Sequence, residues 1–182
     1  VVSASNIRNS VLNKKDFKHQ VPLNVYNVLK NKTLNIDKYF ELLKYKIISE
    51  DNLSKYVEVE EGIDKRIKKY INVSNSLEEL IQNIKTKRYT YNKISRILNH
   101  ILCSYTKDEN IKTLEYIRIL GFNSKGQKYL NSIKKDISIH ILNSYDTKYV
   151  ALNVEKRITD IYSLIQEDIS DFETNNKPIN IN

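Results

Sequence analysis

The chain has 182 residues, enough for one ordinary domain, and 40% of them are hydrophobic, which excludes a chain that is disordered throughout. Only 3 Gly and 2 Pro are present, too few turn residues for an all-β fold, and no apolar run of about 18 residues predicts a membrane span. The net charge of +8 favours a polyanionic partner, although a Lys-rich composition is modest evidence for nucleic acid.

The leader, residues 1–20, begins with two possible helix caps, Ser3 and Ser5. Pro22 then fits the first turn of a following helix. The chain contains no Met and begins with Val1, so we interpret it as a fragment of a longer protein.

Helical spacing of apolar residues dominates the rest of the chain, and a capping box at Ser76 and Glu79 predicts the start of one helix. Residues 111–120 are expected to form another helical segment that ends at Gly121, with a short strand over 116–120 as the alternative. The other predicted helices cover residues 36–48, 61–71, 76–84, 94–102, 124–133 and 149–166.

Neither cysteine chemistry nor a metal site is indicated. Cys103 lies in an apolar stretch and is predicted to be a small buried side chain rather than a catalytic thiol. His19, His100 and His140 are scattered without the spacing typical of metal ligands. We therefore predict no metal site.

The most informative stretch is basic and aromatic, with five cations, two tyrosines and no acid between Lys85 and Arg96. Phosphates attract Lys and Arg, and unpaired RNA bases stack on aromatic rings. The stretch suits RNA binding, although a solvated basic face with locally packed tyrosines explains these residues equally well. The residues predicted to contact RNA here are Lys87, Arg88, Tyr89, Lys93 and Arg96.

Several segments together resemble one family, in the same order along the chain. They are residues 3–8 (Ser-Ala-Ser-Asn-Ile-Arg), 61–66 (Glu-Gly-Ile-Asp-Lys-Arg), 86–90 (Thr-Lys-Arg-Tyr-Thr), 96–102 (Arg-Ile-Leu-Asn-His-Ile-Leu) and 116–122 (Tyr-Ile-Arg-Ile-Leu-Gly-Phe), followed by Lys125-Gly126. This combination resembles the C-terminal part of the tRNA(Met) cytidine acetate ligases, a nucleotidyltransferase-like family.

The resemblance implies an enzyme that uses ATP to form acetyl-adenylate and acetylates N4 of the wobble cytidine of elongator tRNA(Met), in the bacterial cytoplasm. It places Ser3, Ser5 and Arg8 near the triphosphate, where hydroxyls and a guanidinium suit phosphate. Under the RNA-binding hypothesis, Arg118 and Lys125 are expected to join the residues that contact tRNA on one positive surface. The His-x-Gly-His signature of the family is absent, so we expect a missing N-terminal catalytic domain, no cofactor in this chain and no activity of the chain alone.

The expected fold is mainly α: a single multi-helix domain over residues 21–169, preceded by the end of a Rossmann-like nucleotidyltransferase domain, with at most one short β element. Residues 170–182 are expected to form a flexible tail. The alternative function is a helical protein-interaction or structural domain without RNA binding, which predicts dispersed charge and an exposed apolar patch. The oligomeric state is left open.

Overall fold

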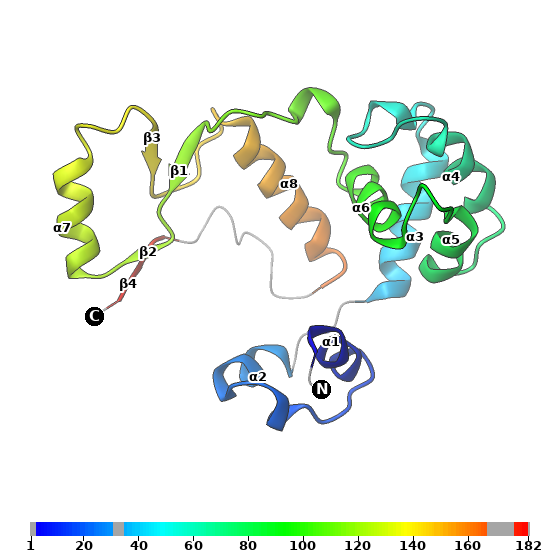
Figure 1. The fold of residues 1–182 in the computed structure, drawn as a ribbon, viewed down its shortest axis with the longest axis horizontal. Coiled ribbons are helices and arrows are strands. Elements are labelled where there is room, and N and C mark those ends of the chain that lie inside the picture. The colour runs from blue at the N-terminus through cyan, green and yellow to red at the C-terminus, as the bar shows by residue number, and fades with distance from the viewer. Residues whose placement is uncertain (1–2, 31–34, 167–176, 182) are drawn as a thin grey trace.

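The computed structural model describes residues 3–30, 35–166 and 177–181. Figure 1 shows an arch, with α3 to α6 at one end, α7 with β1 and β3 at the other, and α8 between them. The helices are α1 (Ala4–Leu12), α2 (Leu23–Leu29), α3 (Ile36–Ser49), α4 (Ile63–Ile71), α5 (Leu77–Ile84), α6 (Tyr91–Leu102), α7 (Ser124–Ile133) and α8 (Val150–Ser163). The strands are β1 (Tyr116–Arg118), β2 (Gly121–Phe122), β3 (His140–Leu142) and β4 (Ile179–Asn180).

Local sequence signals account for the starts of several helices. Ser76 caps α5, since its Oγ accepts from the Glu79 N–H at 3.2 Å. The Glu79 carboxylate accepts at 2.8 Å from the N–H of Asn75, one residue before the cap. At the start of α4, Gly62 has a φ of +80°, in the left-handed region that favours glycine.

The four helices α3 to α6 enclose the main hydrophobic core, with α3 packed on α6 and α4 packed on α5. Their apolar stripes repeat at helical spacing, as the sequence predicts, and all point into this core. Removing these side chains from water is the main favourable contribution to folding. The members of this core with no exposed surface are Leu43, Ile67, Leu80, Ile81, Ile84, Ile94, Ile97, Leu98 and Ile101.

Helix α8 joins this core to the other end of the arch. Ile165, just after α8, is buried in the core, and Tyr162 donates from its hydroxyl to Asn99 Oδ1 at 2.9 Å. Arg157 on α8 binds the two carbonyls that follow α6. Its Nε donates to the carbonyl of Cys103 at 2.9 Å and its Nη2 donates to the carbonyl of Ser104 at 3.2 Å. The same guanidinium makes a bidentate pair with Glu109 at 2.7 and 2.8 Å.

The strands correct the expected fold class: a mainly α chain with at most one β element is wrong. β1 pairs in parallel with β3, and β2 pairs in parallel with β4. Parallel strands require a long crossover, which α7 provides between β1 and β3. Parallel pairing with a helical crossover is typical of α/β proteins. Because most of the chain has helical periodicity, the sequence pattern predicted a mainly α fold instead.

The connection between α6 and α7 also differs from the helix expected over residues 111–120. The described structure there contains β1 and no helix, in agreement with the alternative of a short strand, and Gly121 lies in β2 rather than after a helix. A Cβ on Gly121 would lie 3.0 Å from the carbonyl oxygen of Ile179, so a larger residue there would have to push β4 slightly away from β2.

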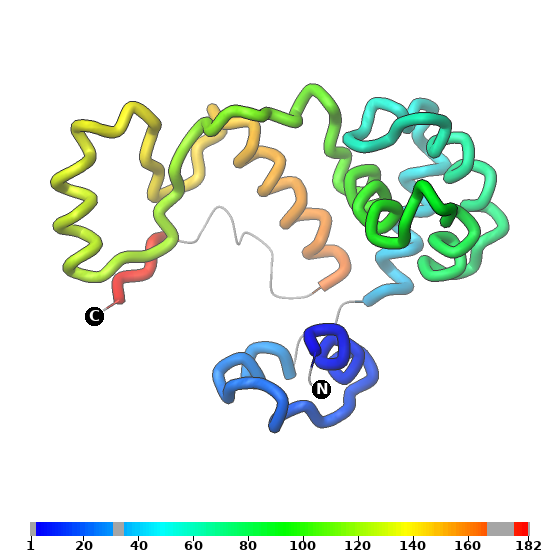
Figure 2. Tube along the Cα trace, viewed as in Figure 1, coloured from blue at the N-terminus to red at the C-terminus, as the bar shows by residue number. Residues whose placement is uncertain are grey.

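The C-terminal residues return to the strand-bearing end, where Ile179 donates its N–H to the carbonyl of Leu120 at 3.0 Å (Figure 2). Residues 170–176 of the expected tail lie outside the described residues, and Ile179–Asn180 form β4. Within the described parts of the chain, no helix has the length and apolar character needed to cross a membrane.

Candidate nucleic-acid interface

A tight turn just before α6 displays the centre of the basic stretch. The Thr86 N–H donates to the carbonyl of Tyr89 at 3.1 Å, and the Tyr89 N–H donates to Thr86 Oγ1 at 3.0 Å. Lys87 and Arg88 occupy the tip of this turn, and both are exposed. The turn therefore holds two cations in solvent on a fixed backbone.

Tyr89, which we expected to contact RNA, supports this turn from inside. Its ring is only 7% exposed, and its hydroxyl donates to the carbonyl of Glu60 at 2.9 Å. Burial raises the pKa of the Tyr89 phenol. Lys93 lies over the same ring, with its Nζ 4.8 Å from the ring centre. This burial leaves little of the Tyr89 ring accessible for stacking on a base.

An acidic segment before α4, whose pairing with the cations was not predicted from the sequence, faces the basic stretch. Arg96 makes a bidentate pair with Glu58, at 2.7 Å from Nε and 2.8 Å from Nη2. Hydrogen bonding from Arg96 lowers the pKa of the Glu58 carboxyl. Arg88 forms an ion pair with Glu61. Lys87 has no acidic partner among the described residues.

The backbone of this acidic segment is unusual. Glu58 has a φ of 63° and Glu61 a φ of 54°, both in the left-handed region, which non-glycine residues seldom adopt. This conformation is unfavourable for a non-glycine residue, so it is kept only where contacts with the surrounding structure stabilise it. Here that conformation brings two carboxylates to Arg88 and Arg96, so the net charge of the surface is lower than the basic sequence suggests.

The Arg-Ile-Leu-Asn-His-Ile-Leu segment of α6 connects several parts of the fold. Asn99 Oδ1 accepts from the hydroxyls of Tyr39 at 2.8 Å and Tyr162 at 2.9 Å, which ties α6 to α3 and α8. The Nδ1 of His100 lies 3.0 Å from the carbonyl oxygen of Val57. The apolar members of the segment enter the core. Most side chains of this segment therefore have a structural role in holding the fold together.

The other two cations expected to contact tRNA lie at the opposite end of the arch. Arg118, on β1, has its Nη1 3.7 Å from Glu155 Oε2 on α8, and its side chain is only 13% exposed. Lys125 lies in the first turn of α7 and is exposed. The structure therefore separates the predicted residues into a basic turn at α6 and a second group at β1 and α7.

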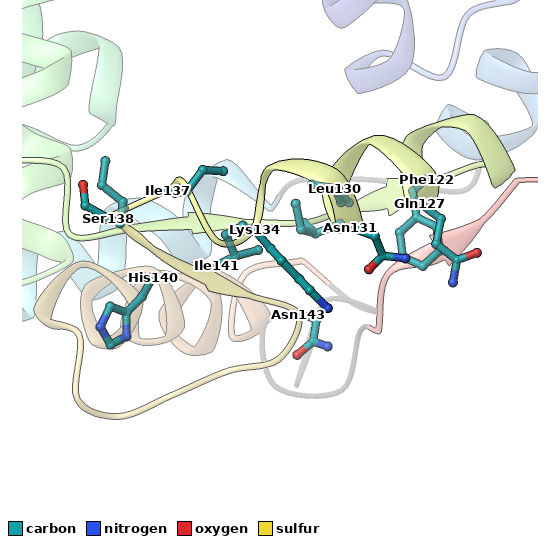
Figure 3. Close-up of a pocket in the computed structure, with 12 residues that line it drawn as sticks. Phe122, Gln127, Leu130, Asn131, Lys134, Ile137, Ser138, His140, Ile141 and Asn143 are labelled. Atoms are coloured by element: carbon teal, nitrogen blue, oxygen red, sulfur yellow. The ribbon is translucent and has the colours of Figure 1, made fainter.

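A cleft of about 640 Å³ opens beside α7, between this helix, β3 and the residues around β2. In Figure 3, Gln127 and Asn131 of α7 and Lys134 directly after it face the cleft, and the Lys134 side chain reaches toward Asn143. None of these residues was predicted from the sequence. Their helical spacing was a usable signal, but the opposing wall comes from β3, whose position depends on the parallel pairing.

The leader residues Ser3, Ser5 and Arg8 lie at the start of α1. Ser3 caps the helix, since its Oγ accepts from the Asn6 N–H at 3.2 Å. Ser5 and Arg8 are exposed, one helical turn apart. All three side chains are exposed, and the Ser3 hydroxyl accepts the cap hydrogen bond while its own proton stays available to a ligand.

The predicted burial of Cys103 is confirmed. Its side chain is 4% exposed, and burial raises the pKa of the thiol to about 11, so it is protonated at neutral pH. A protonated, buried thiol is a poor nucleophile. Over the described residues, no group of three or more His, Cys, Asp or Glu side chains is placed to hold a metal ion.

Comparison with known proteins identifies relatives along nearly the whole chain. The tRNA(Met) cytidine acetate ligase of Clostridium perfringens (strain SM101 / Type A) is 39% identical over 180 residues, covering 93% of this chain and 44% of that protein. The protein of the same name from Staphylococcus carnosus (strain TM300) is 35% identical over 159 residues, covering 85% of this chain and 42% of that protein. The chain thus spans less than half the length of these relatives. The matches do not support the expectation that the chain is the C-terminal part of such a protein.

Two crystal structures share the fold. Thermotoga maritima TmcAL (apo, form I) superposes with a TM-score of 0.81 at 21% identity, over 98% of this chain and 50% of that chain. The form II structure of the same protein, bound with alpha-thio ATP, gives a TM-score of 0.79 at 20% identity, over 100% of this chain and 52% of that chain.

The family match overturns the expectation that nucleotidyltransferase character ends with the leader and that an all-helical domain follows. The model of the family described as HIGH Nucleotidyl Transferase matches residues 1–177, and the parallel strands agree with the Rossmann-like α/β class. The match continues through the helices α3 to α6, the strands β1 to β3 and the helices α7 and α8. The chain belongs to the HIGH nucleotidyl transferase family.

Proposed function

We propose that this protein acts as an ATP-dependent ligase that forms acetyl-adenylate and acetylates N4 of the wobble cytidine of elongator tRNA(Met), and that this chain binds the tRNA. The names of the relatives support the reaction and the substrate. AMP is a good leaving group, so an adenylate activates acetate, and the protein has mainly to position the reactants and stabilise phosphate charge. Because tRNA is the substrate, we place the protein in the bacterial cytoplasm.

The observation that carries tRNA binding is the turn before α6. Its backbone is closed by two hydrogen bonds between Thr86 and Tyr89, and it displays Lys87 and Arg88 to solvent. Phosphate groups bind such cations without sequence preference, and the binding weakens with salt. Lys93, Arg96, Arg118 and Lys125 complete the proposed tRNA contacts.

Removing charge from this surface tests the proposal. Lys87→Ala should weaken binding of elongator tRNA(Met), and should lower the slope of log affinity against log salt by about 1, because one phosphate contact is lost. Lys38→Ala, which removes the same charge from an exposed position on α3, is the matched control. Equal affinities and slopes for the two variants would contradict a role for the turn.

The acidic segment allows a test in the opposite direction. Glu58→Gln keeps the shape of the side chain but releases Arg96 from its bidentate pair, so tRNA binding should tighten and its salt slope should rise by about 1. Asp160→Asn is the control, because it releases Lys156 on α8 from a pair of 2.6 Å. If Glu58→Gln leaves the affinity unchanged or lower, Arg96 does not contact the RNA.

We also propose that Ser5 and Arg8, with Ser3 at the helix start, contact the triphosphate of ATP. The support is their exposure at the N-terminus of α1, together with the ATP analogue bound to the T. maritima relative. Arg8→Ala should weaken binding of ATP in equilibrium dialysis, whereas Lys15→Ala, an exposed cation after α1, should not. Equal binding by both variants would remove Arg8 from the proposed site.

A protein-interaction role is the second candidate, and exposed apolar side chains on α1 and α2 favour it. Leu12 is 45% exposed, Leu23 63% and Val28 55%. Apolar side chains gathered on one surface are typical of protein contacts. If they mediate self-association, the mass measured by light scattering should rise with concentration, and Leu23→Glu should return it to that of one chain. A constant mass would exclude self-association.

A further inference from the structure

The cleft beside α7 is built from one face of that helix. Gln127, Leu130, Asn131 and Lys134 are spaced at i, i+3, i+4 and i+7, and all four line the cleft. Lys128 belongs to the same helix but does not line the cleft. The lining face is therefore distinct from the rest of α7, which allows the two to be tested separately.

The lining combines apolar and polar side chains. Ile119, Phe122 and Ile141 provide apolar surface, and all three are partly accessible. The amides of Gln127 and Asn131 can each donate and accept hydrogen bonds. Lys134 contributes a cation, and none of the described residues that line the cleft carries a carboxylate.

These lining residues restrict the kinds of ligand that the cleft can bind. A flat ring with donors and acceptors at its edge fits a lining that combines apolar side chains with amides, and a single negative charge fits the one lysine. A volume of about 640 Å³ lies within the range of pockets that hold small molecules, roughly 300–1,000 Å³. Both requirements are met by one nucleotide with its base and its phosphate.

We propose that the cleft holds one unpaired nucleotide of the bound tRNA, with its base against Phe122 and its phosphate at Lys134. This inference rests on the proposed function, because the nucleotide belongs to the same RNA that binds the turn before α6. The exposed Lys125 and Lys128 on α7 offer further phosphate contacts beside the cleft. In the single-stranded parts of an RNA, bases can turn outward and stack on an aromatic side chain, which a paired base cannot do.

The test compares intact elongator tRNA(Met) with tRNAs in which each unpaired nucleotide in turn lacks its base but keeps its phosphate. With the native chain, one abasic position should weaken binding about tenfold, as expected for the loss of one stacked base. In Phe122→Leu, which keeps an apolar side chain and the backbone of β2, that position-specific loss should shrink, because the ring is absent.

The charge is tested by two matched lysines, Lys128 in α7 and Lys134 directly after it. Lys134→Ala should weaken binding of the intact tRNA and reduce the penalty at the same abasic position. Lys128→Ala removes an equal charge from outside the cleft, so it should weaken intact and abasic tRNAs by the same factor. Circular dichroism of each variant checks that the fold is retained.

The outcomes separate this site from the proposed function. If the native chain binds no tRNA, the proposed function fails and the site fails with it. If intact tRNA binds but no abasic position matters, or if the penalty persists unchanged in both Phe122→Leu and Lys134→Ala, the nucleotide site alone is overturned.

Discussion

The two ends of the arch differ in how far they are buried. In the helical end, Leu43, Ile67 and Ile97 have no exposed surface, whereas α7 at the strand-bearing end contains no buried residue. Apolar area removed from water supplies most of the favourable free energy of folding, so the helical end provides most of the stability. The strand-bearing end keeps its side chains accessible, which is the condition for binding a ligand.

The largest effect should come from a cavity in the helical core. Ile97→Ala is expected to lower the free energy of unfolding by about 3 kcal/mol, because Ile97 is fully enclosed. Leu130→Ala, on the partly accessible face of α7, should cost about 1 kcal/mol or less. Urea unfolding followed by circular dichroism measures both. Similar losses for the two variants would show that the ends contribute equally to stability.

A smaller effect is expected where α8 connects the two ends. Arg157→Ala leaves two backbone carbonyls after α6 and the Glu109 carboxylate without their donor, so the free energy of unfolding should fall by about 2 kcal/mol. Arg157→Lys keeps the charge but loses the fork of donors, and should recover only part of this loss. Hydrogen exchange of the α8 amides should accelerate in both variants. Unchanged exchange would mean that Ile165 and Tyr162 hold α8 without Arg157.

The smallest effect depends on pH and belongs to the helical end. Hydrogen bonds from Tyr56 and Lys55 lower the pKa of Glu50 from 4.5 to about 2. A lowered pKa stabilises the folded state above pH 4.5, and this contribution is lost as the pH falls toward 2. The difference in free energy of unfolding between the native chain and Glu50→Gln should therefore shrink over this interval. A constant difference would contradict the role of the Glu50 charge.

The same contrast explains what the sequence can predict. At the helical end, each apolar stripe and the Ser76 cap are local patterns, so the helices α3 to α6 follow from the sequence. At the strand-bearing end, β2 pairs with β4, and these partners are far apart in the sequence. Strands of two or three residues also show no clear alternation of apolar and polar residues.

The candidate binding surface was only partly predictable for a related reason. The cations of the turn before α6 are evident in the sequence, but their pairing with Glu58 and Glu61 depends on left-handed backbone conformations that glutamate seldom adopts. The buried position of Tyr89 likewise depends on the carbonyl of Glu60, which is distant in the sequence. Sequence composition therefore identified the charges without showing which of them remain unpaired.

The most direct test of tRNA recognition is the affinity of this chain for elongator tRNA(Met) and for a different tRNA across a series of salt concentrations. We expect binding that weakens steeply with salt, because phosphate contacts release counterions, and that favours elongator tRNA(Met) at every concentration. Salt-sensitive binding without preference would place the selectivity outside this chain. Absence of binding to either tRNA at low salt would contradict the account.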